Sequence, residues 1–341
     1  MFDDARLDSE DALSAADTDL RRLAEAGARV RLESGSGADA IAALDYDIAP
    51  RAVVAAGPDA RLLRAVLEPW SPVPFVAWPG PSLPGWAGAL DLVVVLAPEG
   101  GDAQTASAVR EAVRRGCSLI TATPARSVLA EMAAGRHSTV LPTLTDDTLA
   151  VAVLMLQALH RLGVGPDVDA EGVARALDEV AVACSPNSDI SSNPAKDLAL
   201  GLADSLPLVW GGSVLAARAA RRVVEAMRRS TGRAALSADA DHLMPVLAAA
   251  QARDVFADPY DDEPAASTPA LLVLDDGTEE ASIREQRGRL TVTADGHGVR
   301  VQTIRAADGS ETARYAALLN TGLYTAVYLG VGLGYDGERA E

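Results

Sequence analysis

The sequence predicts an α/β protein with two doubly wound parallel-sheet domains, each a three-layer αβα sandwich. Short segments that are apolar throughout alternate with amphipathic segments of helical period, and glycine turns follow several of the apolar segments. Strands of a parallel sheet are buried on both faces, so they are apolar along their whole length rather than at every second residue. The pattern begins near residue 50 and restarts near residue 205, which indicates two successive domains.

In the first half, the apolar segments predict five strands with helices between them. Residues 3–32 have helical periodicity, and the Gly/Ser-rich stretch ESGSGADA at 33–40 is expected to interrupt it. The helix expected after the third strand, within TASAVREAVRRG, ends at Gly116. The strands are assigned to 51–57, 74–78, 90–96, 117–123 and 138–144.

In the second half, LPLVWGG (206–212) is expected to be a strand that enters a glycine turn, with a helix over 213–231. Pro207 suits the first residues of a strand, where a missing N–H is tolerated. ALLVLDD and a terminal apolar helix follow. The expected domains are an N-terminal helical segment (1–45), a first α/β domain (46–165), a helical connector (166–204), a second α/β domain (205–336) and a tail (337–341).

Charge and composition exclude several classes of function. The net charge of −18 argues against nucleic acid and anionic membranes as partners. No apolar run reaches the length of a transmembrane helix, and the acidic start MFDDARLDSED is unlike a signal peptide. Two cysteines, Cys117 and Cys184, without a CxxC motif indicate a reducing, cytoplasmic compartment and small core residues. The four scattered histidines have no metal-ligand spacing, and we expect neither a metal nor a cofactor.

The stretch VVVLAPEGGDAQT (93–105) has the order of a phosphate-binding loop: a strand, a glycine turn and a helix start. Such a loop aims backbone N–H groups and a positive helix end at an anion. This loop, however, contains Glu99 and Asp102. It therefore raises the question of whether an anion still binds there.

The order of the segments resembles the bifunctional phosphoglucose/phosphomannose isomerase family, which is built from two sugar isomerase (SIS) domains. The resemblance spans roughly residues 50–336 and implies flavodoxin-like αβα sandwiches, a homodimer and aldose–ketose interconversion of a 6-phosphosugar. It rests on SLPGW, LDLVVVL with its glycine turn, AVREAVRRG, NPAKDLALGLADSLPLVWGG, Asp241-His242 and AVYLGVGLGYD.

The departures from the family pattern lie where the phosphate would bind. The family's Ser-x-Ser-Gly-x-Thr loop is similar to residues 97–102, where Ala97 and Glu99 replace the serines and Asp102 replaces the threonine. Thr105 is the only hydroxyl nearby. The family's earlier Gly-Gly-Ser turn is reduced to Ala56-Gly57-Pro58-Asp59, and Thr143 follows Pro142 where the family has an arginine.

The catalytic groups that the resemblance implies are also incomplete. Isomerisation needs a base that moves a proton between neighbouring carbons. It also needs an acid–base group that opens the sugar ring or moves the hydroxyl proton. Only the family's histidine has a match, His242. The glutamate position falls near residues 227–232, which contain no carboxylate, so the nearest acids are Glu225, Asp239 and Asp241. No lysine follows in GYDGERAE, and Arg339 stays protonated.

Most of these residues also have an ordinary structural interpretation. Glu99 and Asp102 are expected to cap the helix that follows, or else to bind a cation or hydroxylated ligand. His242 is either a loop or interface histidine or a retained ligand contact. Lys196 is expected to be exposed near a helix start, or else to be a pocket cation. Gly211, Gly212 and Ser213 either receive an anion or allow close packing of strand and helix.

The sequence thus favours a divergent member of the family that binds a sugar or sugar phosphate as a homodimer, with weak or no isomerase activity. One alternative is an active isomerase in which Asp239 or Asp241 serves as base with His242; another is a non-catalytic partner subunit. The expected catalytic residues are Asp241 and His242. The expected ligand-binding residues are Gly57, Glu99, Gly100, Gly101, Asp102, Thr105, Gly211, Gly212 and Ser213.

Overall fold

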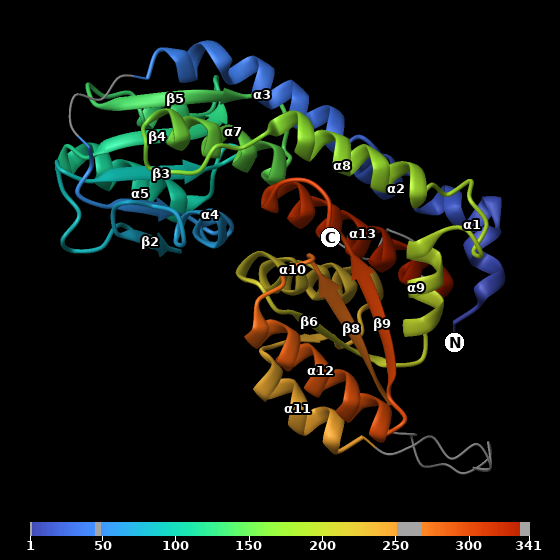
Figure 1. The fold of residues 1–341 in the computed structure, drawn as a ribbon. Helices are drawn as coiled ribbons and strands as arrows, with labels where there is room; N and C mark the ends of the chain where they lie inside the picture. The colour runs from blue at the N-terminus through green and yellow to red at the C-terminus, as the bar shows by residue number, and fades with distance from the viewer. Residues whose placement is uncertain (1, 45–48, 251–267, 335–341) are drawn as a thin grey trace. The chain divides into compact units, whose positions relative to one another are not determined.

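The chain forms two compact units, each with its own parallel sheet (Figure 1). The computed structural model describes residues 2–44, 49–250 and 268–334, so the tail at 337–341, with Arg339, lies outside the described residues. One unit is Ala26–Arg175; the other combines Met1–Glu25 with Ala176–Glu341. The helices expected as a separate segment over 1–45 are therefore divided between the two units.

The first unit contains a five-stranded sheet in which every neighbouring pair is parallel. Its strand order is β2-β1-β3-β4-β5, which confirms the doubly wound arrangement expected from the sequence. All five expected strands are present, each within a few residues of its expected range. The elements are α3 (Ala26–Ala42), β1 (Val53–Ala56), α4 (Ala60–Leu67), β2 (Phe75–Trp78), β3 (Leu92–Leu96), α5 (Ala103–Arg115), β4 (Ser118–Pro124), α6 (Val128–Met132), β5 (Ser138–Thr143), α7 (Thr148–Arg161) and α8 (Ala170–Ala183), which crosses into the second unit.

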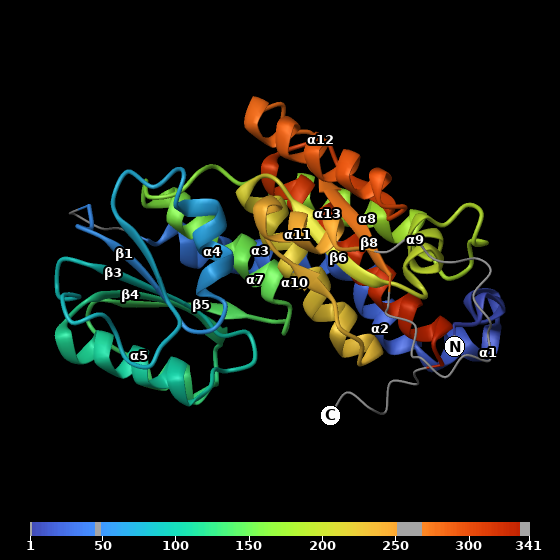
Figure 2. The same ribbon diagram turned by 90° about the horizontal axis from the view of Figure 1, so that it is seen from below.

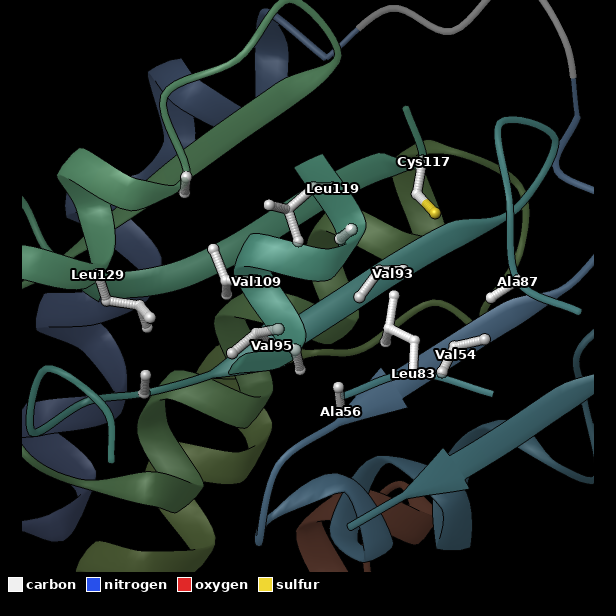
Figure 3. Packing of buried hydrophobic residues seen from close by; sticks show 14 residues of the cluster. Val54, Ala56, Leu83, Ala87, Val93, Val95, Val109, Cys117, Leu119 and Leu129 are labelled. Atoms are coloured by element: carbon white, nitrogen blue, oxygen red, sulfur yellow. The ribbon is translucent and has the colours of Figure 1, made fainter. Parts of the chain in front are cut away.

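Helices cover both faces of this sheet. α3, α4 and α7 contact one another or the strands on one face, and α5 and α6 pack on the other (Figure 2). Between α5 and the sheet, alternate strand residues such as Val54, Val93 and Val95 meet Val109 and form a buried cluster (Figure 3). Burial on both faces explains why these strands are apolar throughout.

The interruption expected at 33–40 is wrong, because α3 continues through it to Ala42. Gly37 is buried, and a Cβ built on it would overlap Leu154 Cδ1 of α7. This glycine therefore lets α3 approach α7 closely instead of ending the helix. Glu33, which is fully buried, accepts hydrogen bonds from the backbone N–H groups of Leu144 and Thr145 at 2.9 and 2.6 Å and so ties α3 to the end of β5.

Two glycine-to-alanine changes in α3 should have opposite effects on stability. Gly37→Ala is expected to destabilise the protein by about 1–3 kcal/mol, because its methyl group overpacks the contact with Leu154. Gly35→Ala is the matched control: its Cβ would meet nothing within 4 Å, so the change should stabilise the helix by up to about 1 kcal/mol. Urea unfolding measures both changes in the free energy of unfolding. Equal changes for the two variants would contradict the assigned contact between Gly37 and Leu154.

The second unit contains a four-stranded parallel sheet of order β7-β6-β8-β9. α10, α13 and α9 contact its strands on one face, and α11 and α12 cover the other (Figure 1). Neither β7, which has only two residues and no apolar run, nor β9 was assigned from the sequence. The elements are η1 (Asp4–Asp8), α1 (Glu10–Ala15), α2 (Asp17–Ala24), α9 (Pro194–Leu202), β6 (Leu206–Gly211), α10 (Val214–Thr231), β7 (Leu236–Ser237), α11 (Ala240–Ala248), β8 (Pro269–Asp275), α12 (Ala281–Gly296), β9 (Arg300–Arg305) and α13 (Glu311–Gly332).

The N-terminal helices η1 and α2 of this unit pack against α13, about 300 residues away in the sequence. Asp3 N donates to Gly332 O at 2.8 Å, and Arg6 Nε donates to Val331 O at 2.8 Å. These bonds satisfy carbonyl groups at the end of α13 that have no partner within the helix. Within the described part of the chain, no helix is long and apolar enough to cross a membrane.

Both cysteines are buried and unpaired, as the sequence indicated. Burial raises the pKa of the Cys184 thiol to about 12, and burial together with Asp91 raises that of Cys117. Because the thiolate is the reactive form, both should react very slowly with a disulfide reagent at pH 8 in the native protein. Unfolding in guanidinium should release both thiols, and fast labelling of the native chain would show that the assigned burial is wrong.

Candidate functional site

The residues expected to bind ligand lie at the topological switch point of each sheet. In doubly wound sheets, ligands bind outside the carboxyl ends of the two strands where the strand order reverses. In the first unit these strands are β1 and β3, which are followed by Gly57 and by the 97–102 loop. In the second unit they are β6 and β8, which end at Gly211 and Asp275 and are followed by Gly212-Ser213 and by Asp276.

In the first unit, a carboxylate of the chain itself occupies the start of the helix. Asp102 is the N-cap of α5, and its Oδ1 accepts a hydrogen bond from the Thr105 backbone N–H at 2.7 Å. The backbone N–H and the side chain of Thr105 hold the pKa of Asp102 below its ordinary value, so the carboxylate stays ionised at neutral pH. The capping interpretation is therefore confirmed for Asp102.

Thr105, the only hydroxyl expected to replace the missing serines, is turned into the protein. Its side chain is 2% exposed. A Cβ on Gly57 would lie 3.2 Å from Thr105 Oγ1, and one on Gly101 would lie 3.5 Å from Thr105 Cγ2. Thr105 thus packs between the loops after β1 and β3. Gly57, Gly100 and Gly101 all have positive φ angles, which glycine adopts readily.

Glu99 differs from Asp102. It precedes the N-cap by three residues and is exposed, so it does not cap α5. Among the described residues, its side chain has no hydrogen bond or ion pair. Glu99 therefore adds a second, solvated negative charge to the mouth of this switch point.

In the second unit, an acid that the sequence analysis missed takes the corresponding place. Ser213 is the N-cap of α10 and accepts from the Ala216 N–H at 3.0 Å, while its Oγ donates to Asp276 Oδ2 in a very short hydrogen bond. Asp276 also accepts from the Thr278 N–H at 3.2 Å. The hydroxyl of Ser213, a residue expected to receive an anion, is therefore bonded to a carboxylate of the chain.

The neighbouring Asp275 belongs to a separate ion-pair network. Its Oδ2 lies 2.7 Å from Arg287 Nη1 of α12 and 3.9 Å from Arg305 Nε at the end of β9. Its Oδ1 accepts from the Gly277 N–H at 3.1 Å. Asp275 therefore pairs with Arg287 and offsets part of the charge of Arg305. A signal for the acidic pair was present in the sequence, because Asp275-Asp276-Gly277 follows an apolar strand just as Glu99 and Asp102 do.

The two glycines at the end of β6 are required by packing. A Cβ on Gly211 would overlap the backbone carbon of Ala216, and one on Gly212 would overlap Ile283 Cγ2. The strand and α10 therefore approach too closely for any side chain at residue 211. This contact supports the packing interpretation of the two glycines.

The expected catalytic pair lies on the surface at the start of α11. Asp241 and His242 are both exposed, and the Asp241 side chain is 83% exposed with Arg289 Nη2 at 3.8 Å. No side-chain hydrogen bond is found for His242 within the described ranges. Nor do these ranges contain a group of three His, Cys, Asp or Glu residues that could hold a metal ion.

Lys196 requires a correction, because the expectation that it is exposed is wrong. Its side chain is fully buried, and Nζ donates to Asp8 Oδ1 at 2.9 Å and to the carbonyl oxygens of Pro186 and Ser188 at 3.0 and 2.8 Å. Nζ also lies 5.6 Å from the centre of the Tyr328 ring. With three acceptors and an aromatic face, this ammonium group is satisfied within the protein.

One known protein family matches part of the chain. Residues 191–341 match the bacterial phosphoglucose isomerase C-terminal SIS domain. No curated protein matches the chain.

Solved structures with the same fold cover nearly the whole chain. A glucose-6-phosphate isomerase-like protein from Thermus thermophilus has a TM-score of 0.57 and 19% identity, over 97% of this chain and 94% of the other. Tagatose-6-phosphate ketose/aldose isomerase from Escherichia coli has a TM-score of 0.65 and 12% identity, over 95% and 94%. The C-terminal domain of glucosamine-fructose-6-phosphate aminotransferase from Francisella tularensis has a TM-score of 0.61 and 9% identity, over 90% and 95%.

Proposed function

We propose that this chain is a divergent double SIS-domain protein that binds a carbohydrate derivative without a phosphate. The proposal starts from the match of residues 191–341 to the bacterial phosphoglucose isomerase C-terminal SIS domain. It has weak or no isomerase activity. The observation that carries the proposal is the position of Asp102 and Asp276, whose carboxylates bond to the N-cap regions of α5 and α10. Each switch point thus already holds an anion of its own.

The electrostatic cost of a second anion is large compared with a typical binding energy. A carboxylate about 4 Å from a phosphate charge raises the free energy by about 4 kcal/mol at an effective dielectric constant near 20. A ligand with a dissociation constant of about 0.1 mM has a binding free energy of only about 5.5 kcal/mol. Exposure of Glu99 and Asp102 reduces the repulsion, but the serine hydroxyls that would offset it are missing.

A sugar without phosphate suits the same groups. Ionised carboxylates are acceptors only, and sugar hydroxyls are donors. Glu99 is exposed with no partner among the described residues, and Asp276 is half-buried at the edge of the second sheet. These two side chains are the ones that we propose to bind hydroxyl groups of the ligand.

The surroundings of Asp241 and His242 support weak or absent catalysis. A general base needs to be held within hydrogen-bonding reach of the proton that it removes, with a pKa near the working pH. Both side chains are exposed, and no neighbouring group among the described residues orients the His242 ring. On the strength of the resemblance, we also propose a cytoplasmic homodimer.

The proposal is tested by an isomerase assay with glucose 6-phosphate and mannose 6-phosphate. We expect turnover well below the range of ordinary enzymes, about 1–1000 per second. Isothermal titration with glucose and mannose should, by contrast, give saturable binding that is weakened in E99A. Turnover in the ordinary range that is abolished in H242A would establish the active isomerase instead.

A further inference from the structure

The unit Ala26–Arg175 contains a cavity at the opposite edge of its sheet from the switch point. The cavity has a volume of about 690 Å³ and lies at the amino ends of β3, β4 and β5, where Leu92, Ser118 and Ser138 begin these strands. Arg161 and Leu162 at the end of α7 complete one wall. The volume is within the range of about 300–1,000 Å³ that is typical of small-molecule sites.

Among the described residues, the charged side chains that line this cavity are arginines, although the chain carries a net charge of −18. Arg136 and Arg161 supply these charges, His137 lies beside them in the lining, and no Asp or Glu is among the described residues that line the cavity. The nearest acid along β3, Asp91, is fully buried and directed elsewhere: its carboxylate bonds to Arg51 at 2.6 Å and to the Gly88 N–H at 2.8 Å. A local concentration of positive charge in an acidic protein attracts an anion.

The two arginines are available to a ligand. Arg136 precedes β5 and Arg161 lies in the last turn of α7; both are exposed, and neither has an ion pair or a side-chain hydrogen bond within the described parts of the chain. A guanidinium group presents paired N–H donors that match the oxygens of a phosphate. The hydroxyls of Ser118, Ser138 and Thr139 supply further donors within the same cavity.

We propose that this cavity binds a small phosphorylated molecule, with its phosphate between Arg136 and Arg161. The apolar part of the lining, which includes Leu90, Leu92 and Leu162, then contacts the carbon skeleton. The site is independent of the proposed function, because it lies at the other edge of the sheet and shares no residue with the switch point.

The test is isothermal titration of the full chain with inorganic phosphate and with glucose 6-phosphate. We expect saturable binding of both probes that weakens at least about tenfold between low salt and about 0.5 M salt, because screening shortens the reach of the arginine charges. R136S/R161S should lose at least about tenfold in affinity. R110S/R221S is the control, since it removes the same charge from exposed helix positions that do not line the cavity.

Two outcomes would overturn the proposal. One is the absence of binding of either probe to the unaltered chain at 10 mM. The other is equal affinity of R136S/R161S and the unaltered chain, which would place the bound phosphate elsewhere. Both results are separate from the switch-point proposal, which predicts that E99A affects glucose binding and leaves phosphate binding at Arg136 and Arg161 unchanged.

Discussion

Replacement of Ala97 and Glu99 by serine and of Asp102 by threonine is expected to create a phosphate site in the loop after β3. The triple variant removes two negative charges beside the N-terminus of α5 and supplies hydroxyl donors. Each hydroxyl bonded to a charged phosphate contributes about 1.5–3 kcal/mol. Threonine is itself a favoured N-cap, so α5 should keep its start. We expect the affinity for glucose 6-phosphate at this loop to rise by at least about 100-fold.

The gain is measured by isothermal titration in the R136S/R161S background, so that binding in the cavity at the amino ends of β3, β4 and β5 does not contribute. A second variant, A97G/E99Q/D102N, removes the charges without adding the hydroxyls and keeps a capping residue. It should recover only the part of the gain that comes from lost repulsion. Equal affinity of the triple variant and its background would show that the two carboxylates are not what excludes a phosphate.

Asp8→Ala is expected to destabilise the protein by about 3 kcal/mol. It leaves the fully buried Lys196 ammonium group with two carbonyl acceptors and no counterion. Removal of one partner of a buried ion pair typically costs about 3–5 kcal/mol; the lower value is appropriate because the Asp8 side chain is 44% exposed. Loss of this bond should also loosen the contact of η1 with α9, which carries Lys196.

The double variant D8A/K196M separates charge from packing. Methionine is similar in length to lysine and carries no charge, so the double variant should be more stable than D8A alone, with a coupling free energy above about 1 kcal/mol. Asp11→Ala, an exposed acid in the first turn of α1, is the control and should cost less than about 1 kcal/mol. Urea unfolding of the unaltered chain, D8A, K196M and D8A/K196M gives the coupling free energy, and D11A is measured beside them. Additive effects of the two changes would contradict the assigned ion pair.

The five strands of the first sheet, and β6 and β8 of the second, were predicted well because burial on both faces of a parallel sheet favours apolar runs. Sequence patterns did not predict elements whose formation depends on contacts with distant residues. β7 has two residues and is held by its pairing with β6, and α3 continues through a Gly/Ser-rich stretch because Gly37 meets Leu154 of another helix. In both cases the deciding contact is far away in the sequence.

The sequence predicted where the candidate loops lie in the fold, but not all of the contacts that their residues make. Sequence order located the loops after β1, β3 and β6, and Asp102 was correctly interpreted as a cap. The pairing of Ser213 with Asp276 spans 63 residues, and the burial of Lys196 depends on Asp8, 188 residues away. Neither partner is identified by local spacing, although the acidic pair after β8 could have been found by inspecting the end of every strand.

The most direct test is a crystal structure of the protein soaked with saturating glucose 6-phosphate. The carboxylates of Asp102 and Asp276 are expected to keep their hydrogen bonds to Thr105 and Ser213, with no phosphate at either switch point. A phosphate held by the backbone N–H groups of Gly100 and Gly101, or by Gly212 and Ser213, would contradict the account.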